Sequence, residues 1–276
     1  MGAGLPLHFA SKSRRVRPQC CAPPVTMTSS DKLEDPPIVE AVLEVRFTAP
    51  ELEEVVVGRL SDLSYWRAAP KTRLPPADIP APVRAANPML LHMPTVEIRN
   101  VVGLNAVRIG GNVLTLHFYR PYAGWETNYP ILKNVVDAAF AAVPTLQINR
   151  LGLRYINVFT KSRHFVSSVS DLALRVEVAH SVLTEPINLT FTSESAHYAC
   201  TTRVASRPFL TGAMDGDASA AVDIDVGTPN GYSVASAESV KTWIDEAHTR
   251  EKQAFRRLLP DDLYLKLRST ENVRSA

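Results

Sequence analysis

The stretch Pro36–Phe47, PPIVEAVLEVRF, alternates apolar and charged residues, and Asn149–Phe159, NRLGLRYINVF, does the same about a hundred residues later. Successive side chains of a β-strand point to opposite faces of its sheet. Each stretch therefore has an apolar and a polar face: Val39, Ala41, Leu43, Val45 and Phe47 against Glu40, Glu44 and Arg46 in the first, and Leu151, Leu153, Tyr155 and Phe159 against Arg150, Arg154 and Ile156 in the second. Because the two polar faces have opposite charge bias, we expect the strands to be neighbours in one sheet.

Length and composition favour a globular protein. The chain has 276 residues, of which 45% are apolar, enough to bury a substantial core in one large domain or two small closely packed ones. Its 30 basic and 28 acidic residues leave a net charge of +2, so nucleic acid is not an expected partner. No apolar run approaches the roughly 18 residues of a membrane-spanning helix, so we expect a soluble body and no membrane partner.

The cysteines and the N-terminal residues indicate whether the protein is secreted or cytoplasmic. Cys20, Cys21 and Cys200 have the spacing of neither a disulfide framework nor a zinc site, which fits a reducing cytoplasm. The first 30 residues are basic and lack the apolar run of a secretory signal. We expect residues 1–34 to be a disordered extension, with the true start near Met27, and 35–270 to form a single α+β domain of two loosely similar halves.

Periodic patterns place further elements around the first two strands. Helices are expected from an N-cap at Thr48, with a capping-box Glu51, to about Trp66, from near Asn128 to Val143, and from Ser236 to about Leu259. The seven prolines between Pro70 and Pro94 exclude helix and central strand there. Gly110 and Gly111 predict a tight turn with positive φ angles. Alternating patterns predict strands at Glu97–Ile109, Val113–Arg120, Asp171–Ala179, Ile187–Thr192, His197–Ser206 and Ala220–Val226. A loop is expected at Gly212–Ser219.

These elements predict the fold class. We expect an α+β protein with a large, mostly antiparallel sheet, or two abutting sheets, and three main helices packed on one side. Helices that cover only one face leave the polar face of the strands to water, a partner or a ligand.

Several of these segments together resemble a family of proteins. The opening PPIVEA, the turn with Trp125 ahead of a helix, RLGLRYIN at Arg150–Asn157, the Asp223–Asp225 strand and the late helix with His248 and Phe255 are similar to a sporadically distributed bacterial family of uncharacterised proteins. The resemblance covers roughly Asp35 to Leu267. It implies a bacterial protein and supplies no activity or catalytic residues.

The main candidate site is the polar strand face, formed by Glu40, Glu44, Arg46, Arg150, Arg154, Asp223 and Asp225. Carboxylates alternating with guanidiniums can hold a phosphorylated ligand while the acids position a divalent metal. Enzymes that hydrolyse triphosphates in an antiparallel tunnel tend to show Glu-x-Glu-x-Lys on their first strand, whereas this chain has Glu44-x-Arg46. The alternative is a structural ladder in which each cross-strand pair contributes about 0.2–1 kcal/mol.

Other residue types give weaker signals. The histidines show no close metal-ligand spacing, and His248 is expected to hydrogen-bond into the sheet and orient its helix. Cys200 is expected to be a small core residue. No nucleophile-elbow or phosphate-binding motif occurs, so no cofactor is expected.

These observations favour a protein without catalysis of its own. We predict an interaction module that engages another protein through its exposed sheet face or a sheet edge. The alternative is a metal-dependent phosphohydrolase, or a binder of phosphorylated ligands, that uses the charged strand face.

Overall fold

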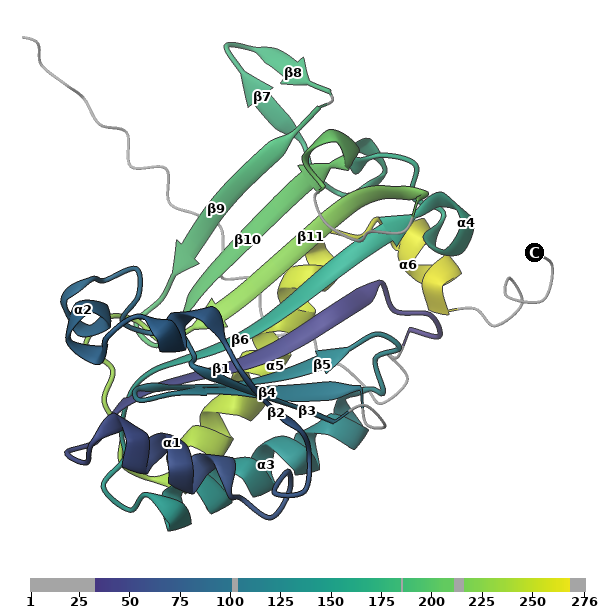
Figure 1. Ribbon diagram of the computed structural model, residues 1–276. Helices are drawn as coiled ribbons and strands as arrows, with labels where there is room; N and C mark the ends of the chain where they lie inside the picture. The colour runs from purple at the N-terminus through teal and green to yellow at the C-terminus, as the bar shows by residue number, and fades with distance from the viewer. Residues whose placement is uncertain (1–32, 101–103, 185, 211–215, 269–276) are drawn as a thin grey trace, which may run out of the picture. The chain divides into compact units, whose positions relative to one another are not determined.

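One antiparallel sheet of nine strands organises the described part of the chain (Figure 1). The computed structural model describes residues 33–100, 104–184, 186–210 and 216–268. The strand order is β2-β3-β4-β5-β1-β6-β11-β10-β9, and a separate sheet holds β7 and β8. The bounds are β1 Ile38–Thr48, β2 Lys71–Arg73, β3 Val96–Asn100, β4 Asn105–Gly110, β5 Val113–Tyr119, β6 Gln147–Thr160, β7 Val176–Val178, β8 Ser181–Leu183, β9 Asn188–Glu194, β10 Ala199–Ser206 and β11 Ala218–Gly227.

Apart from the short edge strand β2, which lies beyond β3, the strand order is symmetric about the pair β1 and β6. On one side lie β5, β4 and β3, and on the other lie β11, β10 and β9. Each set of three is an antiparallel meander whose last strand returns beside the central pair, and a long helix follows each meander. The two alternating stretches of the sequence form β1 and β6, which are direct neighbours, as predicted.

Three helices cover one face of the sheet (Figure 1). They are α1 Glu53–Ser61, α3 Trp125–Ala142 and α5 Ala237–Arg257. The α+β class, the large antiparallel sheet and the three main helices on one side are therefore confirmed. Shorter elements are α2 Ala81–Ala86, α4 Lys161–His164, α6 Asp261–Arg268 and the 3-10 turns η1 Pro75–Asp78, η2 Val169–Asp171 and η3 Arg207–Phe209. No helix in the described ranges has the length and apolar character needed to cross a bilayer.

The core lies between the sheet and these helices. The apolar faces of β1 and β6 are almost completely buried, and Leu43 lies opposite Leu153 in the register. From the helices, Leu132, Val136 and Ile244 pack against the same core. The period-two pattern therefore identified the buried face of both central strands correctly.

The start of α1 differs from the prediction. Thr48 is not a cap, because it is the last residue of β1 and pairs with Gln147. Glu51 is not part of a capping box either, since its carboxylate accepts from the hydroxyl of Thr145 at 2.8 and 2.9 Å. The helix begins later, after Leu52, whose side chain is exposed.

The predicted strand Glu97–Ile109 is in fact two strands, β3 and β4. Leu104, with a φ of 48°, belongs to the connection between them. In the β4–β5 hairpin, Gly110 is already paired with Val113, and neither Gly110 nor Gly111 has a positive φ. Both glycines are required for space instead: a Cβ on Gly111 would lie 2.6 Å from the side chain of Glu53.

Three further predictions need correction. The proline-rich segment contains the short helix α2, because Pro82 lies in its first turn, where a missing N–H costs nothing. The helix expected near Asn128 begins at Trp125, directly after Gly124 with a φ of 92°. Only Val176–Val178 of the strand expected at Asp171–Ala179 forms, since Asp171 instead accepts backbone N–H groups around a 3-10 turn.

Two predictions concern segments at the limits of the described residues. The extension expected over residues 1–34 lies outside them except for Leu33 and Glu34, and 211–215 of the loop expected at Gly212–Ser219 lie outside as well. The last two residues of that loop, Ala218 and Ser219, belong to β11.

Candidate functional site

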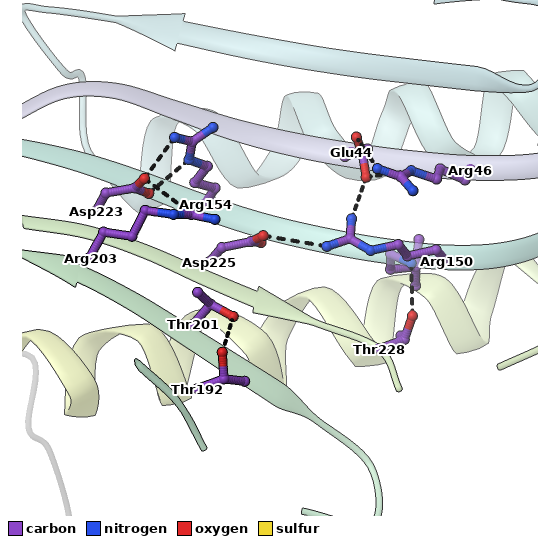
Figure 2. Close-up of polar contacts among 11 residues, drawn as sticks. Glu44, Arg46, Arg150, Arg154, Thr192, Thr201, Arg203, Asp223, Asp225 and Thr228 are labelled. Atoms are coloured by element: carbon purple, nitrogen blue, oxygen red, sulfur yellow. Dashed lines mark hydrogen bonds and ion pairs between the residues drawn. The ribbon is translucent and has the colours of Figure 1, made fainter. Parts of the chain in front are cut away.

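The strand register gathers the predicted site residues on the face of the sheet opposite α1, α3 and α5, which we call the open face. Figure 2 shows all of them except Glu40. Arg46 lies opposite Arg150 across β1 and β6, and Arg154 lies opposite Asp225 across β6 and β11. All seven predicted residues are on this face, because alternate side chains along a strand point to the same face of the sheet. Whether they act as a site or as a structural ladder depends on their contacts.

The centre of the open face is a chain of ion pairs across three strands. Glu44 of β1 pairs with Arg46 on its own strand at 2.8 Å and with Arg150 of β6. Arg150 also reaches Asp225 of β11 at 3.4 Å. Burial raises the pKa of Asp225 against the opposing charge of Arg150. The charge of Arg150 thus offsets only part of the cost of burying the Asp225 carboxylate.

Two glycines make room for the guanidinium of Arg150. A Cβ on Gly152 would lie 2.7 Å from Arg150 Nη1, and one on Gly227 of the neighbouring strand would lie 3.1 Å from Nη2. The glycine within RLGLR thus allows the guanidinium to lie close to the sheet between Glu44 and Asp225. The motif encodes a charged contact in addition to a strand.

A second group is centred on Asp223. Arg154 donates to both of its carboxylate oxygens at 2.7 Å, and Arg203 of β10 donates to one at 3.0 Å. The bond to Asp223 raises the pKa of Arg154, so this guanidinium is held in its charged form. Bidentate arginine–carboxylate pairs are among the strongest and best oriented ion pairs in proteins.

A third group is centred on Glu40, whose hydrogen-bond partner differs from the ion-pair partners of Glu44. His117 Nδ1 lies 2.7 Å from a Glu40 oxygen, and Nε2 of the same ring lies 2.8 Å from the hydroxyl of Thr115. Burial opposes ionisation of Glu40, but the hydrogen bond to His117 and the charges of Arg108 and Arg154 outweigh it and lower its pKa. The two glutamates of β1 are thus engaged by different partners.

The ladder continues into strands whose charged residues were not predicted as part of the site. Glu97 of β3 accepts from Arg108 of β4 at 2.7 Å and from Arg99 at 3.1 Å. Arg203, His117 and these three residues were not predicted as part of the site, because the sequence alone did not place their strands beside the central pair β1 and β6. The alternation of apolar and polar residues within β3, β4 and β10 was the signal that could have placed these side chains on one face of their strands.

The two kinds of charge are unequally exposed on the open face. The six arginine side chains of the three groups and the β3–β4 pair are 30–52% exposed, whereas the five carboxylate side chains are 13–25% exposed. A molecule that approaches the sheet therefore meets guanidinium groups first. The carboxylates lie deeper and hold the guanidiniums in place.

A separate polar cluster lies in the core beneath the sheet. The hydroxyl of Tyr155 is 3.3 Å from His248 Nδ1 and 3.2 Å from the hydroxyl of Tyr122, so the prediction that His248 bonds into the sheet is confirmed. Glu251, one turn further along α5, is 5% exposed, and burial raises its pKa to about 8. Glu251 was not among the residues predicted for a site, although it lies four residues after Ala247 in the apolar stripe of this helix.

Comparisons with known proteins do not identify the chain. No protein-family model matches it, and no curated protein matches it either. The resemblance to the sporadic bacterial family stays a prediction. Within the described ranges, no group of three or more histidine, cysteine, aspartate or glutamate residues has the arrangement of a metal site.

Proposed function

We propose that this protein is a protein-binding module, without catalysis of its own, that docks a partner on its open face. The observation that carries the proposal is the layer of partly exposed guanidiniums above paired carboxylates on a continuous antiparallel sheet. The neighbouring helices cover the opposite face, so the charged side is the one left for a partner (Figure 1).

Pre-formed ion pairs favour binding because they reduce its entropic cost. A mobile arginine side chain loses conformational entropy about several rotatable bonds when it is fixed at an interface. Arg154 and Arg203 are already held by Asp223, yet each guanidinium has five N–H donors and uses only part of them. The remaining donors suit carboxylates and carbonyl oxygens of a partner, and arginine is enriched at protein interfaces.

The phosphohydrolase alternative receives no comparable support. It requires Glu40 and Glu44 to converge on one metal ion, whereas Glu40 bonds His117 and Glu44 bonds Arg46 and Arg150. A divalent cation would have to displace these contacts before it could bind. The enzyme activity is nevertheless simple to test by incubation with nucleoside triphosphates and Mg²⁺ or Mn²⁺. We expect no hydrolysis by the wild type. Hydrolysis that is lost in Glu44→Ala would support the phosphohydrolase.

The proposal is tested by affinity purification from the native host followed by hydrogen exchange of the purified complex. We expect protection of amides in β1, β6 and β11, and loss of the partner from the double variant Arg154→Ala/Arg203→Ala. The matched control is Arg59→Ala/Arg67→Ala, which removes two exposed, ion-paired arginines in and just after α1. Retention of the partner by the first variant, or protection confined to the helices, would contradict the proposal.

A further inference from the structure

The two edges of the nine-stranded sheet are built differently. At one edge, β2 has three residues, two of which are Lys71 and Arg73, and Pro70 and Pro75 lie close on either side. Short length, positive charge and proline are the usual protection of an edge strand against pairing with another chain. At the other edge, β9 has seven residues, NLTFTSE, without lysine, arginine or proline, although Pro186 lies two residues before it. Its length and the lack of positive charge leave this edge less protected than β2.

The hydrogen-bond pattern shows which groups β9 presents at the edge. The N–H of Ser195 bonds the carbonyl of Tyr198 at 2.8 Å, and the N–H of Ser206 bonds the carbonyl of Ile187 at 2.8 Å. In an antiparallel pair, bonded and non-bonded positions alternate. Odd-numbered residues of β9 therefore bond to β10, and even-numbered residues direct their backbone groups outward: Asn188, Thr190, Thr192 and Glu194.

We propose that β9 pairs with β9 of a second copy of this chain, antiparallel and about a twofold axis at Phe191. In this register the outward-directed residues meet one another, so that Thr190 faces Thr192 of the other copy and Asn188 faces Glu194. Each such pair exchanges two backbone hydrogen bonds. The sheet then continues from one copy into the other.

The side chains of β9 are compatible with this self-pairing. The only charged residue of the strand, Glu194, meets the neutral Asn188, so no like charges are opposed. Phe191 is 43% exposed and projects to the helix-covered side, where it meets Phe191 of the other copy. Aromatic pairs across strands stabilise a sheet. An equivalent pairing of β2 would bring lysine and arginine residues together.

The hairpin of β7 and β8 adds apolar surface at the same edge. It precedes β9 in the chain and extends beyond the start of that strand (Figure 1). Its Val178, Val182 and Leu183 are 46–56% exposed. Antiparallel pairing brings the β9–β10 turn of the second copy to this end of β9, which favours burial of these side chains. The inference is independent of the proposed function, because the open faces of both copies stay available.

Cysteine cross-linking tests both the surface and the register. In a background with Cys20, Cys21 and Cys200 changed to serine, Phe191→Cys should form a disulfide-linked dimer on mild oxidation. Non-bonded antiparallel pairs have Cα atoms about 4.5 Å apart, within the range of a disulfide. Ser193→Cys alone should not cross-link, but an equimolar mixture of Ser193→Cys and Leu189→Cys should, because these positions face each other in the proposed register.

Sedimentation equilibrium of the purified protein measures the association itself. We expect a dimer for the wild type and at least a tenfold weaker dimer for Thr190→Pro, which removes an outward N–H but no bond to β10. Thr190→Val keeps that N–H and should dimerise normally. As a second variant with no backbone change, Thr190→Lys/Thr192→Lys should also be monomeric, since the lysines oppose each other. A monomeric wild type, or a dimer whose cross-links do not follow the register, would overturn the proposal.

Discussion

The imidazole of His248 lies flat on the indole of Trp125, with ring centroids 3.8 Å apart and ring planes 9° apart. The contact joins α5 to the first residue of α3, and the other side of the cluster is the hydroxyl of Tyr155 in β6. Burial, together with the charge of Lys252, lowers the pKa of His248 to about 3. The ring is therefore neutral at physiological pH, and it links both long helices to the sheet.

Acid should weaken the fold through His248. Its pKa is about 3 in the folded protein, against 6.5 for an unperturbed histidine, so the unfolded chain binds the proton first as pH falls from 6.5 to 3. Stability is lost over this window by up to about 1.4 kcal/mol per pH unit. We expect His248→Gln to be less stable than wild type at pH 7 but to lose less on going to pH 4. Urea unfolding at both pH values measures this, and equal acid sensitivity of the two proteins would contradict it.

Glu251 should act in the opposite direction. Burial raises its folded pKa to about 8 from 4.5, so the folded protein retains a proton that the unfolded chain has released. Its contribution to stability is complete below pH 4.5 and is lost as pH rises towards 8. Glu251→Gln should therefore gain stability relative to wild type between pH 5 and pH 8, by roughly 2–4 kcal/mol. A difference that does not change with pH would show that Glu251 is solvated in the folded state.

Asp223 should contribute more to the stability of the ladder than Arg203 does. Asp223→Asn removes the charge of the carboxylate that pairs with both Arg154 and Arg203, so we expect a loss of about 1–2 kcal/mol in unfolding free energy. Arg203→Ala leaves the bidentate Arg154 pair intact, and its exposed position predicts a loss below about 0.5 kcal/mol. Urea titrations at low and high salt distinguish the two cases. Equal effects of both variants would contradict this order.

Gly152→Ala should disconnect the central ion pairs without unfolding the sheet. The new methyl group displaces the guanidinium of Arg150, which is the end of a flexible side chain, so the stability cost should stay below about 1 kcal/mol. The measurement is a double-mutant cycle between Glu44 and Arg150. We expect a coupling energy in the wild-type background and none in the Gly152→Ala background. An unchanged coupling would mean that Arg150 does not depend on the space above Gly152.

Cys200 should behave as a core residue and not as a nucleophile. It packs against the core from β10, and burial raises the pKa of its thiol. Because only the thiolate reacts, alkylation by iodoacetamide at pH 8 should be at least tenfold slower in the native protein than in urea, once Cys20 and Cys21 are changed to serine. Native alkylation as fast as that of the unfolded chain would contradict burial of the sulfur.

Much of the architecture was predictable from local patterns. The alternation in β1, β6 and β11 and the helical spacing around Leu132 and Ile244 indicated the buried faces correctly, because these periods follow from backbone geometry alone. Errors occurred where a single residue had two uses. Thr48 fits a helix cap but extends β1, and Gly111 fits a turn with positive φ but provides space beside Glu53.

The alternating pattern was sufficient to predict that the charged residues within each of β1, β6 and β11 share one side of their strand, since the side-chain period of a strand is two. Which of them pair could be known only from the folded protein, where Glu44 pairs with Arg150 while Glu40 pairs with His117. Those pairings depend on strand order and on register shifts such as that between Arg46 and Phe47, which no local pattern records. The edge position of β9 was likewise not predictable, because it depends on the order of strands in the sheet and not on their order in the chain.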